Sequence, residues 1–260
     1  MKIIKVKSLS GYISAIKKTH EHMFCEPVDI WYRGISDSSY ELVPGTVWRK
    51  IDEANHQGIV EEWLNEYVLY SDKQLEDGYD IYALAQHYGL PTRLLDWTTS
   101  PLIALYFALE QDEVNEKRIV WAINPFRLNK LKTDWDGHLS VSDKFLRETY
   151  SLDKYLPEPL GGISSEHLKA GPIALRVQPS NKRISSQKGC FTLHGTCRDT
   201  ISSILSNDKE SQILKIEING KTTRKKLLQE LFVLGVTEDS IFQDLSSLST
   251  RLKRVWGVTS

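Results

Sequence analysis

The chain has 260 residues, of which 40% are hydrophobic and 26% are charged, and its formal net charge is −1. This length allows one large domain or two small ones, and the apolar content is enough for a packed core. The nearly balanced charge argues against a broad basic surface for nucleic acids or membranes, although a local basic groove is compatible with the composition. No apolar run approaches the roughly 20 residues that a transmembrane helix needs.

The first segment, 1–7, alternates between apolar and charged residues as a β-strand does. It lacks the long apolar stretch of a signal peptide, so we expect a cytoplasmic protein with no membrane partner.

Cysteine usage is sparse. The three thiols, Cys25, Cys190 and Cys197, are typical of reduced cysteines, because an odd and small number does not build a disulfide framework. Two clusters contain potential metal ligands: His20, His22 with Cys25, and Cys190, His194 with Cys197. Neither cluster has the paired C-x-x-C spacing of a zinc site, so we expect no bound metal.

Helices are expected to dominate the first half of the chain. Apolar spacing and helix-end signals predict helices at about 8–24, 52–75, 80–88 and 100–109. Ser8 and Asp80 are predicted N-caps, and Ser100 or Thr99 is expected to cap the helix that begins at Pro101. Residues 29–34 are expected to form a short strand that ends in a glycine turn.

Strands are expected to dominate the second half, at 118–123, 172–177, 189–194 and 213–218, before helices at 222–235, 237–242 and 245–256. The weakly periodic segment 129–171 is expected to be an insertion or a long loop with short helices. Strict βαβ alternation is absent, which favours an α+β fold with a mixed or antiparallel sheet flanked by helices. We expect a single domain over 1–260, with its motif-bearing core at about 28–255.

The stretch 86–101, QHYGLPTRLLDWTTSP, carries the densest set of polar groups. Gly89 and Pro91 interrupt a helix, so we expect a turn between two buried segments, where binding and catalytic groups often occur. Arg93 and Asp96 stand among Leu and Trp residues and must either be paired or face a ligand. The sequence leaves open whether they pair with each other.

Arg33 and His87 are two further candidates. The Arg33 guanidinium, at the end of a predicted strand, could fork two hydrogen bonds onto a phosphate or a carboxylate. The alternative is a buried structural pair, for instance with Asp96. His87 is a candidate acid–base group, although a lone histidine is more often a satisfied core residue.

The remaining candidates have simple structural alternatives. Thr92 could cap the turn, and Tyr106 on the buried helix could be a core residue with a satisfied hydroxyl. Gln187 does not titrate and would orient a substrate, or it is a turn residue; His194 is equally open. The sequence has no P-loop, no nucleophile elbow and no zinc-protease motif.

These residues together resemble a known family. Tyr32-Arg33-Gly34, the stretch His87–Trp97 and Ala104–Ala108 resemble the FRG domain family, which is named for an aromatic-Arg-Gly motif. Segments 183–191 and 241–245 are also similar to its pattern, so the resemblance extends over about Ile30 to Lys253. The family implies a bacterial or phage protein, often encoded near mobile elements or defence systems, and little settled chemistry.

The order of these segments is also similar to that of ADP-ribosyltransferases. This resemblance implies that Arg33 holds the pyrophosphate or ribose of NAD, that Tyr106 lines the pocket and that Gln187 takes the late polar role. Tyr32, Gly34 and Thr92 are expected in the same cofactor site. Because glutamine is not a base, general-base duty would fall to another group or to none.

Three hypotheses follow. The first is an NAD-dependent ADP-ribosyltransferase-like enzyme in a toxin or phage-defence system, in which Arg33 and Arg93 offset the charge of the diphosphate. The second is another nucleotide-processing or nucleic-acid-processing enzyme that uses His87 and Asp96 as an acid–base pair. The third is a non-catalytic binding module. A small-molecule nucleotide is the expected partner, and a protein or nucleic-acid acceptor stays open.

Overall fold

The computed structural model describes residues 2–23, 30–71, 74–111, 117–162, 168–177, 182–208 and 212–258. Cys25, which entered the predictions above, lies outside the described residues.

Eight strands form one mixed sheet in the order β1-β8-β4-β2-β3-β7-β6-β5. The strands are β1 (Lys2–Val6), β2 (Trp31–Ile35), β3 (Leu94–Thr98), β4 (Lys117–Ile123), β5 (Leu139–Ser140), β6 (Ile173–Arg176), β7 (Gly189–Leu193) and β8 (Ile213–Asn219). β1 runs parallel to β8 and β5 parallel to β6, while the other neighbours are antiparallel. The predicted α+β fold with a mixed sheet is therefore confirmed.

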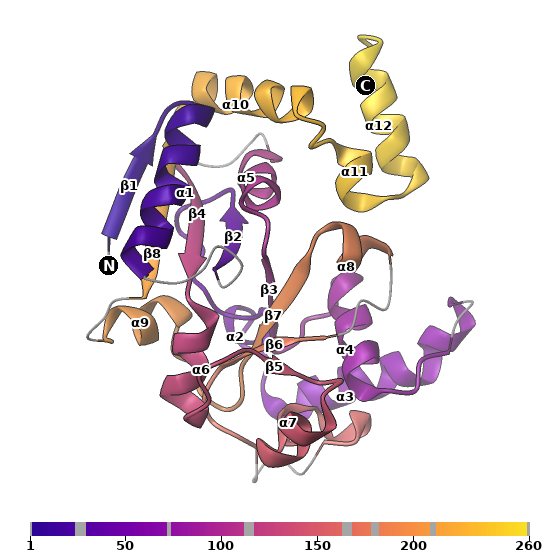
Figure 1. The fold of residues 1–260 in the computed structure, drawn as a ribbon. Helices are drawn as coiled ribbons and strands as arrows, with labels where there is room; N and C mark the ends of the chain where they lie inside the picture. Colours follow the sequence, from indigo (N-terminus) through magenta and orange to yellow (C-terminus); the bar gives the residue numbers. More distant parts are fainter. Residues whose placement is uncertain are drawn as a thin grey trace.

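Helices lie around this sheet, with the C-terminal helix projecting away from it (Figure 1). They are α1 (Leu9–Met23), α2 (Gly45–Trp48), α3 (Glu53–Glu66), α4 (Gly78–His87), α5 (Pro101–Leu109), α6 (Pro125–Thr133), α7 (Lys144–Thr149), α8 (Lys182–Ser186), α9 (Ile201–Ser206), α10 (Lys221–Val233), α11 (Glu238–Phe242) and α12 (Leu245–Val255). Three 3-10 turns are η2 (Tyr67–Leu69), η3 (Leu152–Tyr155) and η4 (Glu158–Leu160). None of the described helices combines the length and the apolar character that a membrane crossing requires.

Three buried clusters form the core. The first joins α1, α5 and α10 to β4 and β8, for example through Tyr12 and Leu105. The second joins α3 and α4 to β3, β6 and β7, and the third joins α6 and α9 to strands that include β3. Leu94 belongs to the second cluster and Leu95 and Trp97 to the third, because successive side chains of a strand point to opposite faces. β3 is therefore packed on both faces.

Several predicted helix ends are confirmed. The Ser8 hydroxyl accepts a hydrogen bond from the Gly11 N–H at 3.1 Å, and the Ser100 hydroxyl caps α5, which begins at Pro101. Gly89, with φ of +86°, follows the end of α4. These signals succeed because a cap or a left-handed glycine is a local property of the chain.

Other expected boundaries were wrong. The helix predicted at 52–75 ends at Glu66, because the chain tightens into η2 and then folds back, so that Leu75 contacts the Tyr67 hydroxyl. α4 is capped by Asp77, not by Asp80. It begins at Gly78, where a Cβ would stand 2.3 Å from the Leu160 carbonyl oxygen, so the close approach of η4 sets the start.

The segment 129–171 contains more regular structure than a loop. It holds β5, α7, η3 and η4, and β5 extends the sheet at its edge. A two-residue strand gives almost no alternation to detect, which explains why the sequence did not reveal it. Whether this segment is an insertion stays a prediction.

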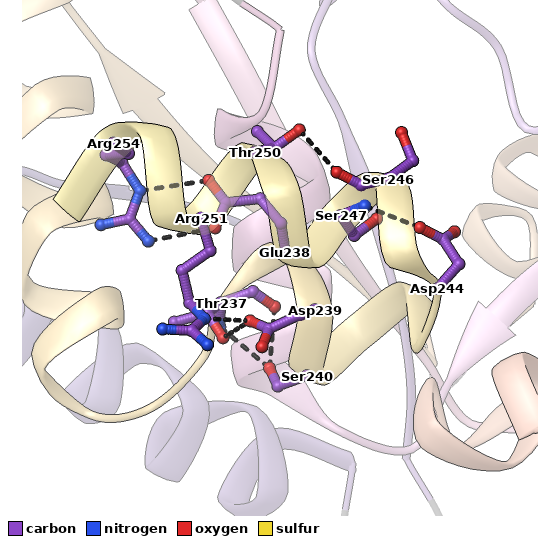
Figure 2. Close-up of polar contacts among 10 residues, drawn as sticks. All are labelled: Thr237, Glu238, Asp239, Ser240, Asp244, Ser246, Ser247, Thr250, Arg251 and Arg254. Carbon is purple, nitrogen blue, oxygen red and sulfur yellow. Dashed lines mark hydrogen bonds and ion pairs between the residues drawn. The ribbon is translucent and has the colours of Figure 1, made fainter. Parts of the chain in front are cut away.

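The C-terminal helix α12 is attached mainly by side-chain contacts to α11 (Figure 2). Arg251 donates to the Asp239 carboxylate at 2.8 Å, and Arg254 makes two hydrogen bonds to Glu238 at 3.0 and 3.2 Å. No residue of α12 is buried. This part of the molecule lies apart from the core.

Candidate functional site

A cleft of about 360 Å³ lies where β2 and β3 diverge. The two strands pair at Tyr32 and Thr98 only, and the antiparallel register would next pair Gly34 with Asp96. That pairing is absent; instead, the Arg33 Nη1 donates to the Asp96 carbonyl at 2.7 Å. The guanidinium thus satisfies a carbonyl that the ladder leaves without a partner, and the gap between the strands becomes the cleft.

The cleft collects residues that are far apart in the sequence. Its walls come from β2, β3, the ends of α4 and α5, and the turn before β7. The lining residues are Tyr32, Arg33, Gly34, Ile35, Ser36, Tyr40, Gln86, His87, Asp96, Trp97, Thr98, Phe107, Glu110, Gln111 and Gln187. Six of the nine predicted site residues are among them, namely Tyr32, Arg33, Gly34, His87, Asp96 and Gln187.

A chain of hydrogen bonds fixes the Asp96 carboxylate. The Leu94 N–H donates to the Thr92 hydroxyl at 3.0 Å, and this hydroxyl donates to Gln86 Oε1 at 2.5 Å. Gln86 Nε2 then donates to Asp96 Oδ2 at 2.7 Å. The directions follow from the Asp96 end: the carboxylate oxygen accepts, so it faces the Gln86 amide nitrogen, and Gln86 Oε1 is left to accept the proton of the Thr92 hydroxyl.

Arg33 and Asp96 form the charged centre of the cleft. Arg33 Nη1 lies 3.8 Å from Asp96 Oδ2, with 26% and 53% of the two side chains exposed. Burial lowers the pKa of the Arg33 guanidinium and the neighbouring Asp96 carboxylate opposes this shift. Arginine is so strong a base that the group remains a cation. Arg33 and Asp96 therefore pair, as one alternative predicted, but the pair is partly exposed and lines the cleft, so the expectation of a buried structural pair was wrong.

Gln187 lines the cleft and has an unsatisfied donor. Its Nε2 is buried and has no hydrogen-bond partner among the described residues. Its backbone carbonyl accepts a hydrogen bond from the Thr98 hydroxyl at 2.7 Å, which ties the turn before β7 to the end of β3. A buried amide without a partner is costly, so this group is available to a ligand.

His87 lines the cleft and also a smaller adjoining cavity of about 40 Å³, which Asp96 and Gln187 share. Its ring makes an edge contact with Tyr88, at 5.0 Å between centroids. The structure therefore brings His87, Asp96 and Gln187 together, as a common site requires.

Gly34 has a packing role. A Cβ on this residue would stand 1.8 Å from the Ala104 carbonyl oxygen and 2.6 Å from the Ala108 nitrogen. The glycine lies inside β2 and not in a turn after it, so the predicted glycine turn was wrong. Its small size lets the backbone of α5 lie directly against β2, beside the cleft.

The structure separates Arg93 from the other candidates. The expected turn is confirmed only between α4 and β3, at 88–93, because Leu94–Thr98 form β3 in the middle of the sheet. Arg93 does not line the cleft; its Nη2 donates to the Tyr155 carbonyl at 2.9 Å, and its Nη1 lies 3.6 Å from Glu53 Oε1. Arg93 and Asp96 therefore have different partners, and the expectation that Arg93 acts beside Arg33 lacks geometric support.

Thr92 and Tyr106 also lie outside the lining of the cleft. Thr92 acts on the cleft indirectly, through Gln86. Tyr106 is buried and packs against Phe107 and Phe242, so Phe107 takes the lining position that the resemblance gave to Tyr106. Neighbouring residues of a helix point about 100° apart, and the sequence alone does not set the helix rotation.

His194 and the thiols do not form a metal centre in the described structure. His194 is buried, its Nε2 lies 3.3 Å from the Asp199 carbonyl, and burial lowers its pKa to about 4. Among the described residues, no group of three or more His, Cys, Asp or Glu side chains is placed to hold a metal ion. The ligand set that includes Cys25 lies partly outside the described residues.

Sequence reasoning missed nine of the fifteen lining residues, and three of these shape the site. Gln86 orients Asp96, while Tyr40 and Phe107 add aromatic surface to the lining. Gln86 begins the most polar stretch of the chain, and this position was a usable signal. Tyr40 lies in a loop without a motif, and nothing in the sequence marks it.

A comparison with protein-family models gives one match, to the FRG domain over residues 28–117. The chain contains an FRG domain. The matched residues include β2, α4, β3 and α5, and hence most of the cleft, whereas Gln187 lies beyond them. The wider extent of the resemblance, to Lys253, stays a prediction. Searches of curated proteins and of solved structures found no match.

Proposed function

We propose that the cleft of this FRG domain protein binds a nucleotide, with NAD as the ligand and an ADP-ribosyltransferase-like reaction as the activity. The observation that carries the proposal is the convergence of Arg33, Asp96, His87 and Gln187 on one cleft from four separate segments. The volume of about 360 Å³ falls within the range of roughly 300–1,000 Å³ of small-molecule sites.

The chemistry of the lining supports a ligand that has anionic, polar and aromatic parts. Arg33 is the one Lys or Arg in the described lining, so it is the group that would meet the pyrophosphate. The fixed Asp96 carboxylate suits ribose hydroxyls, and the Gln187 amide offers a free donor. Tyr40 at the exposed rim and Phe107 provide flat surfaces for a base or a nicotinamide ring.

The direct test is a thermal shift with NAD, followed by an assay of nicotinamide release. NAD is expected to raise the melting temperature, since a ligand that binds the folded state stabilises it. Arg33→Gln should keep its fold and lose both the shift and the release. Arg176→Gln, an exposed arginine on β6, is the matched control and should behave like the wild type.

The outcomes separate the hypotheses. A shift without nicotinamide release would support a binding module, and a shift with release, both lost in Arg33→Gln, would support the enzyme. No shift at millimolar NAD, with the protein folded, would overturn the assignment of NAD.

A second candidate is a nucleotide-processing or nucleic-acid-processing enzyme in which His87 and Asp96 exchange protons. One observation favours it: both residues line the cleft and also its adjoining cavity. A bell-shaped pH profile that His87→Gln abolishes would support it. A toxin or phage-defence role is proposed on the family resemblance alone.

A further inference from the structure

A second cavity, of about 170 Å³, lies at the start of β3 and shares no lining residue with the cleft. It is enclosed by α2, α3 and the segment that follows β7. The lining residues are Thr46, Val47, Ile51, Glu53, His56, Arg93, Leu168, Gly195, Thr196 and Arg198.

Polar atoms without partners are concentrated around this cavity. Thr46 Oγ1, His56 Nδ1, and both Nε and Nη1 of Arg93 are buried and make no hydrogen bond within the described structure. All three residues are more than nine-tenths buried. Buried polar groups nearly always have a partner, so several orphans around one cavity require an explanation.

The hydrogen bonds around His56 show that its Nδ1 is a donor, as the Arg93 nitrogens always are. The Arg93 backbone N–H donates to the Tyr82 hydroxyl at 2.7 Å, which leaves the hydroxyl proton for His56 Nε2 at 3.0 Å. Burial lowers the pKa of His56, with the neighbouring Glu53 carboxylate opposing the shift, so the neutral ring is favoured. A neutral ring that accepts at Nε2 carries its proton on Nδ1.

The nearest acceptor does not satisfy these donors. Glu53 Oε1 lies 3.6 Å from Arg93 Nη1 and 3.9 Å from His56 Nδ1, which is too long for hydrogen bonds. Gln57 Nε2 holds this oxygen at 2.6 Å. Arg93 and Arg198 together outweigh the single Glu53 carboxylate, so the cavity has an excess of positive charge and of donors.

We propose that this cavity is a binding site for a small oxyanion, with phosphate as the class of ligand. An anion would accept hydrogen bonds from Thr46, His56 and Arg93, and Arg198 would close over it from the exposed side. The orphan donors belong to residues that line the cavity. Glu53, one-third exposed, is the group that moves aside when the anion enters. The site is separate from the nucleotide function proposed for the cleft.

Inorganic phosphate is the first probe, measured by thermal shift and by calorimetry against sodium chloride of equal ionic strength. Thr46→Val is the decisive variant, since it keeps the shape and removes only the orphan hydroxyl. Without phosphate it should be as stable as the wild type or more so, because no bond is lost. With phosphate it should bind about tenfold more weakly, or worse, because a hydrogen bond to a charged group is lost.

Arg198→Gln tests the exposed wall without disturbing the core, and Lys225→Gln on α10 is its charge-matched control. Arg198→Gln should weaken phosphate binding severalfold, and Lys225→Gln should leave it unchanged. Adenosine monophosphate, compared with free phosphate, distinguishes a phosphate carried by a nucleotide from the free ion. The proposal would be overturned if phosphate gave no specific shift, or if Thr46→Val and Arg198→Gln both bound phosphate as tightly as the wild type. The cavity would then be one that water fills.

Discussion

Thr92 and Arg93 are adjacent in the chain, but their side chains serve two different regions. Thr92 supports the cleft through Gln86 and Asp96, and each polar group in this chain of hydrogen bonds has a partner. Arg93 lines the second cavity, where two of its nitrogens have none. A dense polar motif is therefore not one site: Thr92 belongs to a satisfied network that supports the cleft, and Arg93 belongs to a cavity with several unsatisfied donors.

The first prediction concerns the frame of the cleft. Gly34→Ala should destabilise the protein by about 4 kcal/mol or more, because the new methyl group overlaps the backbone of α5, which does not yield as a flexible side chain does. Chemical denaturation measures this. Gly58→Ala in α3 is the control: a Cβ there meets nothing within 4 Å, so it should stabilise by about 0.5–1 kcal/mol. Equal stabilities for the two variants would contradict the close packing of β2 on α5.

The second prediction compares the two arginines. Arg93→Met should cost about 3 kcal/mol, because the Tyr155 carbonyl loses its donor and Glu53 loses the nearby cation. Arg33→Met should cost about 1 kcal/mol or less, since Arg33 is one-quarter exposed, and yet it should abolish ligand binding in the cleft. Urea unfolding and the thermal-shift assay measure the two effects. A stability loss for Arg33→Met as large as that for Arg93→Met would remove the distinction between the regions.

The third prediction uses pH. The pKa of His194, whose backbone N–H donates to the Arg93 carbonyl, is lowered by burial to about 4 in the folded state, against about 6.5 when unfolded. The unfolded state binds the extra proton, so this stability is present above about pH 6.5 and is lost as the pH falls toward 4. The expected loss between about pH 7 and pH 5 is about 2 kcal/mol.

His56 contributes a slope of the same sign, since burial also lowers its pKa. The contribution of His194 is therefore the difference between the wild type and His194→Gln. The stability of this variant should vary less with pH than that of the wild type. Identical slopes for the two proteins would show that His194 titrates normally.

The fourth prediction tests the two threonines directly. Thr92→Val should cost about 1–2 kcal/mol, because the Leu94 N–H and Gln86 Oε1 both lose their partner. Thr46→Val should cost nothing in the absence of an anion. Differential scanning calorimetry in phosphate-free buffer compares them, and a similar cost for both would mean that the Thr46 hydroxyl has a partner after all.

The helices, strands and site residues that have a local signal in the sequence were predictable. Ser100 and Pro101 before an apolar run define α5, and the apolar segments of the second half define β6, β7 and β8. The candidates Arg33, His87, Asp96 and Gln187 were each found from their residue type and their position next to an expected element.

The rest depended on tertiary order. The cleft exists because β2 and β3 pair at one residue pair only and then diverge, and no local pattern encodes the order in which strands pair. The assignment of Arg93 and Tyr106 to the cleft failed for the same reason. The direction of a side chain depends on where its element docks, and here Arg93 turns to Glu53 and Tyr155.

The last prediction sets a baseline outside both regions. Arg251→Ala, which removes the contact of α12 with Asp239 seen in Figure 2, should cost less than about 1 kcal/mol. The loss is small because both side chains are partly exposed and because Asp239 keeps the hydrogen bond from the Thr237 hydroxyl at 2.7 Å, the larger cause of its lowered pKa. Urea unfolding at low and high salt, with Lys253→Ala on the same helix as the control, measures it. A cost near that of Arg93→Met would mean that α12 is part of the cooperative core. The C-terminal helix would then be a third region that contributes to stability, beside the cleft and the cavity, and not a baseline for them.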